Sequence, residues 1–211
     1  MPIQCGPSHV GTSLSLLRVW TLLLLATAVI AARALAQTPD DGRLSAGQRQ
    51  IADLKSTRHD ITISAQLDRP DATYRIGDGL ELTLTASEDV FVTVLNVGSS
   101  GRVIVLVPNA HEKVVRSPTG TAITIPARHA PYAIRVGGPP GFELIRIIAT
   151  KEPIDLFAGQ AHQPGGIFRS LDKPAVDLAR GLSADLGRQA KHGYVVADLV
   201  IRVIGSVPSP R

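Results

Sequence analysis

Histidines and carboxylates are the residues of this chain that could carry out acid–base or metal chemistry. The histidines that follow residue 36 are His59, His111, His129, His162 and His192. No two of them are spaced i, i+4, the spacing that presents two imidazoles on one face of a helix. Glu112 directly follows His111, and we interpret that pair as a solvated loop tip. The sequence therefore predicts no metal site and no cofactor.

The sequence also gives no support for nucleophilic catalysis or glycoside hydrolysis. It contains neither a G-x-S-x-G turn nor an H-E-x-x-H helix. Three carboxylates, Glu81, Glu143 and Asp198, fall within expected strands. We expect Glu81 and Asp198 to face solvent, whereas Glu143 can be paired. Because a sequence does not fix the distance between two carboxylates, it identifies no acid–base pair. We assign no catalytic residue and predict that the protein is not an enzyme.

The charge balance argues against a nucleic-acid partner. The chain has 22 basic and 18 acidic residues, and residues 1–36 contribute Arg18 and Arg33 but no acidic residue. Without that segment the chain is nearly neutral and contains no run of five like charges. Binding to a phosphate backbone requires a positive surface, so we expect no nucleic acid to bind.

Residues 1–36 have the composition of a signal peptide. An apolar run, VWTLLLLATAVIAA, follows Arg18, and a small-x-small pattern ends at Ala36. We predict cleavage between Ala36 and Gln37, export to the periplasm, and no stable membrane span afterwards. The alternative is an uncleaved anchor over residues 14–32, but Arg18 interrupts that segment and is costly in hydrocarbon. The only cysteine lies in the leader, so the exported chain would have no disulfide.

Residues 59–205 show the alternating patterns and turns of a mainly β domain. In residues 80–86 leucines alternate with polar residues, as in a strand with one buried face. Residues 90–107 predict a hairpin, and residues 142–150 predict a strand inside its sheet. Many short strands separated by Gly and Pro turns favour a sandwich or barrel. Residues 37–58 form a polar spacer in which Ser45 can cap a short helix.

The pattern changes near the C-terminus. An apolar stripe of Ala175, Ala179, Leu182, Leu186 and Ala190 predicts a helix over residues 174–192. Residues 194–204 predict a final long strand that completes a sheet, and residues 206–211 form a tail. We expect the helix to cover an open edge or an end of the sandwich.

Residues 74–153 resemble a bacterial family through the order of their motifs. The motifs are Tyr74-Arg75-Ile76-Gly77-Asp78, Gly101-Arg102-Val103, Leu106-Val107-Pro108-Asn109, Ile125-Pro126 and Pro140-Gly141-Phe142-Glu143-Leu144. In this order they resemble the family called domain of unknown function 4384 (DUF4384). The resemblance implies an immunoglobulin-like β-sandwich module of envelope or secreted proteins, and it implies no catalytic residue. The chain departs from the family at Asp89-Val90-Phe91, where a Gly-aromatic pair is usual.

Three functions from different classes remain open. The favoured hypothesis is a non-enzymatic interaction or accessory module that binds another envelope or secreted protein, through an open strand edge or through loops at one end of the sandwich. The loop residues singled out are Asn109, His111, Glu112, Lys113, Arg116, Gly138, Pro139 and Pro140. The second hypothesis is a small-ligand binder with a pocket between the sandwich and the C-terminal helix. The third is an unrecognised hydrolase. The sequence does not predict the oligomeric state.

Overall fold

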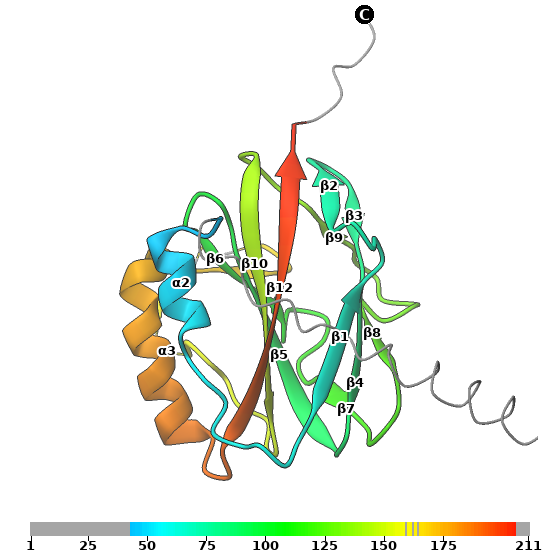
Figure 1. Ribbon diagram of the computed structural model, residues 1–211, viewed down its shortest axis with the longest axis vertical. Coiled ribbons are helices and arrows are strands. Elements are labelled where there is room, and N and C mark those ends of the chain that lie inside the picture. Colours follow the sequence, from blue (N-terminus) through cyan, green and yellow to red (C-terminus); the bar gives the residue numbers. More distant parts are fainter. Residues whose placement is uncertain (1–42, 159, 162, 164, 206–211) are drawn as a thin grey trace, which may run out of the picture. The chain divides into compact units, whose positions relative to one another are not determined.

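The computed structural model describes residues 43–158, 160–161, 163 and 165–205, and the statements below concern these residues (Figure 1). In chain order the elements are α2 (Ala46–Ala52), β1 (Ile63–Leu67), β2 (Thr73–Arg75), β3 (Gly79–Leu80), β4 (Leu82–Ala86), β5 (Val90–Val97), β6 (Val103–Val107), β7 (Arg116–Ser117), β8 (Ile123–Ile125), β9 (Ile134–Arg135), β10 (Gly141–Thr150), β11 (Arg169–Ser170), α3 (Ala175–Gln189) and β12 (Tyr194–Ile204). The predicted mainly β class is confirmed, as are the C-terminal helix and the long strand after it.

Two sheets face each other, and α2 and α3 cover the outer side of the larger one (Figure 1). The larger sheet has the strand order β11-β6-β5-β10-β12-β2, with β7 paired to β5. The smaller sheet has the order β1-β4-β8, and β3 pairs with β9. The molecule is therefore a β-sandwich with helices as a third layer. This architecture is compatible with an immunoglobulin-like fold, which stays a prediction.

Strand β10 shows why the larger sheet is apolar on both faces. Successive strand residues point to opposite sides. Ile145 and Ile147 accordingly join the core shared with the smaller sheet, whereas Leu144 and Ile148 join the core beneath the helices. All four side chains are at most 1% exposed. Both faces of β10 are therefore buried and mostly apolar, as residues 142–150 suggested.

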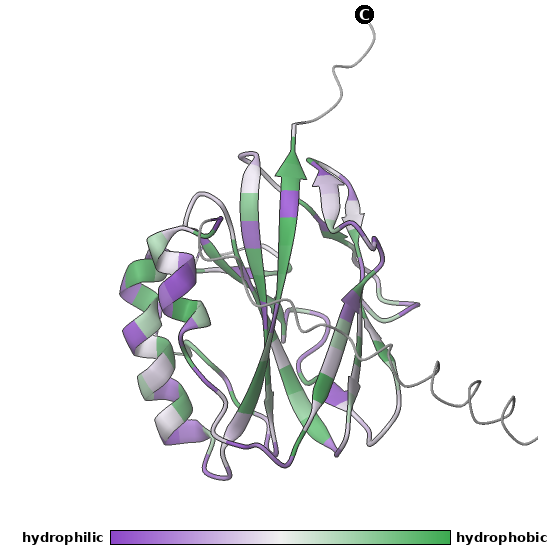
Figure 2. Cartoon of the chain, viewed as in Figure 1, coloured by the Kyte–Doolittle hydropathy of each residue, from purple (hydrophilic) through white to green (hydrophobic). Residues whose placement is uncertain are grey.

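Helix α3 packs along this outer face of the larger sheet. Its buried leucines, Leu178, Leu182 and Leu186, lie in the same core as Leu144 and Ile148. Figure 2 shows apolar and polar residues alternating along both helices, as expected of helices with one buried face. The prediction that the helix covers an edge or an end of the sandwich is wrong, because the outer face of the sheet is itself apolar and must be covered.

Residues 43–58 lie against the larger sheet. Ser45 caps α2: its hydroxyl accepts the Gln48 N–H at 3.3 Å, and the Gln48 side chain accepts the Ser45 N–H at 2.7 Å. Gln48 also donates to the carbonyl oxygens of Val97 and Phe142, at 2.9 and 2.8 Å. Ile51 is fully buried. The short helix that Ser45 can cap is therefore present, and it anchors this segment to the sheet. Within the described residues, no helix has the length and apolar character needed to cross a membrane.

Candidate functional site

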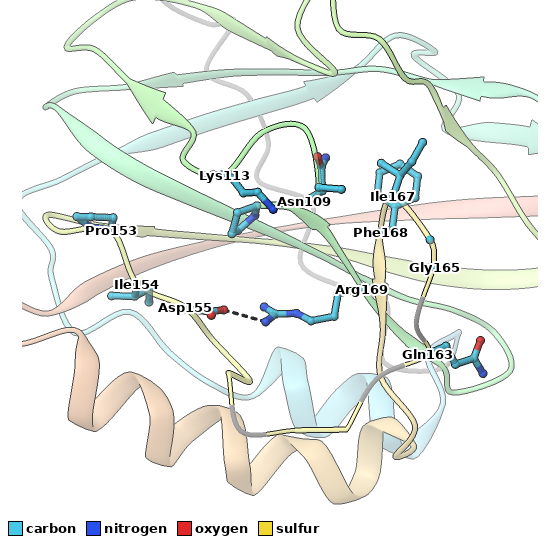
Figure 3. Close-up of a pocket in the computed structure, with 13 residues that line it drawn as sticks. Asn109, Lys113, Pro153, Ile154, Asp155, Gln163, Gly165, Ile167, Phe168 and Arg169 are labelled. Atoms are coloured by element: carbon cyan, nitrogen blue, oxygen red, sulfur yellow. Dashed lines mark hydrogen bonds and ion pairs between the residues drawn. The ribbon is translucent and has the colours of Figure 1, made fainter.

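A groove of about 440 Å³ is lined by residues from three segments of the chain (Figure 3). One wall consists of residues 108–110 and 113, which follow β6. The other wall consists of residues 153–155, which follow β10, and of residues 163 and 165–169, which lead into β11. The backbone N–H of Ala110 donates to the carbonyl of Ile167 at 3.0 Å and joins the two walls.

Asn109 shapes the first wall. Its side-chain amide donates to the carbonyl of Leu106 at 2.8 Å, and its side-chain oxygen accepts the N–H groups of His111 and Glu112, both at 2.9 Å. This is the local backbone capping for which Asn is favoured in loops. Asn109 is buried and closes this turn, and Lys113, four residues further along the chain, is exposed at the groove.

Helix α3 holds the second wall in place. The Gln189 side chain accepts the N–H of Asp155 and donates to its carbonyl, both at 3.0 Å. The Asp185 carboxylate accepts the N–H of Phe157 at 3.1 Å. Phe157 is fully buried with φ of 64°, a backbone conformation that is strained for a residue with a side chain. The wall is thus fixed by polar contacts to a packed helix.

Three aromatic residues form a cluster at the groove. The rings of His111 and Tyr132 are stacked with centroids 5.8 Å apart, and Phe168, which lines the groove, meets Tyr132 edge-on at 5.6 Å. The Tyr132 hydroxyl donates to the Glu112 carboxylate. Burial, and to a lesser extent this carboxylate, raises the pKa of Tyr132. Because the three rings pack against one another, their role is to support the wall of the groove.

The surface of the groove combines apolar side chains with one positive charge that has no partner among the described residues. Arg169 is paired with Asp155 at 2.9 Å and donates to the Leu156 carbonyl at 2.6 Å. Lys113 forms no hydrogen bond or ion pair with any residue that the structure describes. A smaller hollow shares Pro108, Lys113, Pro153 and Ile154 with the groove, and Val114 lines it.

Exposed apolar side chains concentrate at this place. Among the described residues, three large apolar side chains are exposed: Val114 (55%), Ile167 (38%) and Val176 (44%). Ile167 lines the groove and Val114 lines the adjoining hollow. Exposed apolar side chains that gather at neighbouring hollows mark a candidate interaction surface.

The structure brings together only some of the residues predicted to form interaction loops. Asn109 and Lys113 line the groove, whereas His111 and Glu112 contact Tyr132 and Arg116 is paired with Asp89. Arg116 and Glu112 thus have structural partners within the fold.

The remaining predicted loop residues, Gly138, Pro139 and Pro140, lie elsewhere. The Ser99 hydroxyl donates to the Pro139 carbonyl at 2.7 Å, beside the start of β10. The groove includes Pro153, and the hollow next to it includes Thr150, at the end of β10. Ten strand residues span about 33 Å. The expectation that both loops lie at one end of the sandwich is therefore wrong.

The sequence interpretation missed a buried ion pair next to α2. Arg146 on β10 is opposite Asp198 on β12, and the two side chains are 3.0 Å apart. Arg146 is fully buried and also donates to the Leu54 carbonyl. Burial raises the pKa of Asp198, whereas the Arg146 guanidinium acts to lower it. Asp198 does not face solvent as expected, since its side chain is only 15% exposed. An arginine within an apolar interior strand is the signal that could have revealed this pair.

Glu143 is paired, as the sequence allowed, and its role is structural. It accepts a hydrogen bond from the Asn96 amide at 2.9 Å and is 3% exposed. Burial raises its pKa.

The described residues give no catalytic constellation. No three of their His, Cys, Asp or Glu side chains are grouped so that they could hold a metal ion. His59, His111, His129 and His192 are exposed and dispersed, and His162, Ala36 and Gln37 lie outside the described residues.

Ser170 and Lys173 have S-x-x-K spacing, which the sequence interpretation overlooked. The Ser170 hydroxyl is buried without a hydrogen-bond partner, and the Lys173 side chain is exposed. No hydrogen bond joins them, so they do not form a nucleophile and base.

Comparison with known proteins gives one result. Residues 73–153 match the family model described as Domain of unknown function (DUF4384). No curated protein and no solved structure matches the chain. The matched segment contains the first wall of the groove and ends at Pro153, and the rest of the second wall follows it. The groove is therefore built jointly by the matched domain and the segment after it.

Proposed function

We propose that the protein is a non-enzymatic interaction module of the bacterial cell envelope. Residues 73–153 match the DUF4384 family model, and the residues after them complete a groove on that segment. The groove is its binding site, and its partner is another envelope or secreted protein.

The observation that carries the proposal is the arrangement at the groove. It combines two of the three exposed large apolar side chains of the described chain with one cation, Lys113, that has no partner there. Loops held by a rigid scaffold are common binding sites. Here Asn109 fixes one wall, and Asp185 and Gln189 fix the other.

The envelope location rests on the sequence of residues 1–36. Their apolar run and their small-x-small ending are typical of a secretory signal. The proposed partner is accordingly one that is present in the periplasm or outside the cell.

A small-ligand binder is the second candidate, and the size of the groove favours it. Ligand pockets commonly have about 300–1,000 Å³, and this groove has about 440 Å³. The site differs from the one predicted for such a ligand, because buried leucines of α3 pack directly on the larger sheet. The groove instead lies between loops.

In-cell crosslinking tests the proposal. The tagged protein would be crosslinked in its native envelope, and captured proteins would be quantified by mass spectrometry. Ile167→Asp places a charge in the groove, and Val176→Asp is the matched control because Val176 is equally apolar and exposed but lies on α3. We expect one dominant envelope protein with the wild type and with Val176→Asp, and loss of it with Ile167→Asp. Equal capture by all three proteins, or no reproducible capture, would contradict the proposal. In the latter case a thermal-shift screen would test the small-ligand candidate.

A further inference from the structure

Lys113 is the charged residue of the groove that has no ion-pair partner among the described residues. Among the described residues that line it, the other two charged side chains, Arg169 and Asp155, are paired with each other at 2.9 Å. The remaining unpaired charge is positive, so the groove attracts an anionic group on its partner.

Lys113 lines two hollows that both contain apolar side chains. The groove includes Ile167 and Phe168, and the smaller hollow includes Val114 and Val115. The two hollows share Lys113 and Ile154, so they are continuous. A ligand that fills both hollows puts an anionic group at Lys113 and apolar groups next to it.

An extended peptide fits this surface better than a glycan does. Glycan sites commonly offer open aromatic faces for stacking, whereas the rings near the groove contact one another: Tyr132 stacks on His111, and the rings of Tyr132 and Phe168 meet at an interplanar angle of 76°. An extended peptide instead offers side chains at regular intervals of about 3.3 Å per residue. Its carboxylate can pair with Lys113 while neighbouring aliphatic side chains cover Ile154 and Ile167.

We propose that the partner of this groove is an extended peptide segment with an acidic residue flanked by aliphatic residues, its carboxylate paired with Lys113. This inference rests on the proposed function, since it specifies the chemistry of the partner that the groove binds.

The test is a double-mutant cycle with defined probes. One fluorescein-labelled decapeptide carries a central aspartate between leucines, and its matched probe carries asparagine there. Binding to the full protein is measured by fluorescence anisotropy, with Lys113→Met as the variant. Lys173→Met serves as the control, because Lys173 is also exposed but precedes α3. A parallel titration uses a polyuronate as an anionic glycan.

We expect the wild type and Lys173→Met to prefer the aspartate probe roughly two- to fivefold, the range of an exposed ion pair. Lys113→Met should bind both probes equally. The preference should shrink between about 0.05 and about 0.5 M NaCl, because salt screens exposed charges.

Several outcomes would overturn the inference: equal binding of both probes by the wild type, an unchanged preference in Lys113→Met, or binding of the polyuronate in place of the peptides. Failure of both peptides to bind, while Ile167→Asp still abolishes capture in cells, would overturn the peptide chemistry and leave the groove as the site. Loss of the Ile167→Asp effect would instead refute the proposed function.

Discussion

Replacement of Arg146 by methionine tests how the segment around α2 is held on the larger sheet. Arg146 is fully buried, pairs with Asp198 at 3.0 Å and donates to the carbonyl of Leu54. The variant removes the ion-pair partner of Asp198, for which Lys55 is the other nearby cation, and the donor to the Leu54 carbonyl. Removing one partner of a buried ion pair costs about 3–5 kcal/mol. Because the Asp198 side chain keeps 15% exposure, we expect the lower end, about 3 kcal/mol.

The double variant Arg146→Met with Asp198→Val separates the ion pair from general packing. Only the Leu54 carbonyl then loses its partner, so we expect a cost of about 1 kcal/mol. Unfolding in urea would be followed by circular dichroism, because the only tryptophan, Trp20, lies outside the described residues. In thermal unfolding the single variant should lose about 6–12 °C, at about 2–4 °C per kcal/mol for a chain of this size. The single variant Asp198→Val completes the cycle. The reasoning is refuted if the double variant loses as much stability as Arg146→Met and Asp198→Val together, or if Arg146→Met is as stable as the wild type.

Three further predictions concern single side chains. Asp185→Ala leaves the buried N–H of Phe157 without an acceptor and should lower the free energy of unfolding by about 1–3 kcal/mol in urea titrations; the exposed Asp177→Ala on the same helix should cost less than about 1 kcal/mol. Burial raises the pKa of Glu143 above 4.5, so its contribution is greatest below pH 4.5 and is lost as the pH rises; Glu143→Gln should flatten thermal stability above that pH, and an unchanged profile would contradict this. Hydrogen bonds from Thr119 hold the pKa of Asp89 at about 2, so this stabilisation is present above pH 3.8 and is lost as the pH falls toward 2; Asp89→Asn should remove that acid-side loss from the melting profile.

Local patterns predicted most of the secondary structure. The final strand has the predicted bounds, Tyr194–Ile204, and residues 90–107 form the predicted hairpin of β5 and β6. These elements follow from alternation and turn residues, which are local properties of the sequence. Helix α3 ends at Gln189, three residues before the predicted end, and Gly193 then turns the chain with φ of 76°.

Features that depend on strand order could not be predicted in the same way. Strands apolar on both faces indicated interior positions, but that pattern does not say which layer covers each face. The outer face, with Leu95 and Leu144, required the helices as a third layer. Arg146 and Asp198 meet only because β10 and β12 pair in one particular register.

The candidate site was predicted in part. Lys113 and Asn109 were identified from a polar loop, but Asp155, Ile167 and Arg169 were not. The segment 154–171 has no periodic pattern, and its place in the groove results from contacts with α3 and β6 that are distant in sequence. Such contacts leave no local signal.

The central claim is that the groove is where the partner binds, and site-specific photocrosslinking tests it most directly. A photoreactive phenylalanine analogue would replace Val114, beside the groove, or Val176, on α3, as valines of similar exposure (55% and 44%). In living cells, position 114 should give one dominant crosslinked envelope protein and position 176 should give none. Equal products at both positions, or products at position 176 alone, would contradict the account.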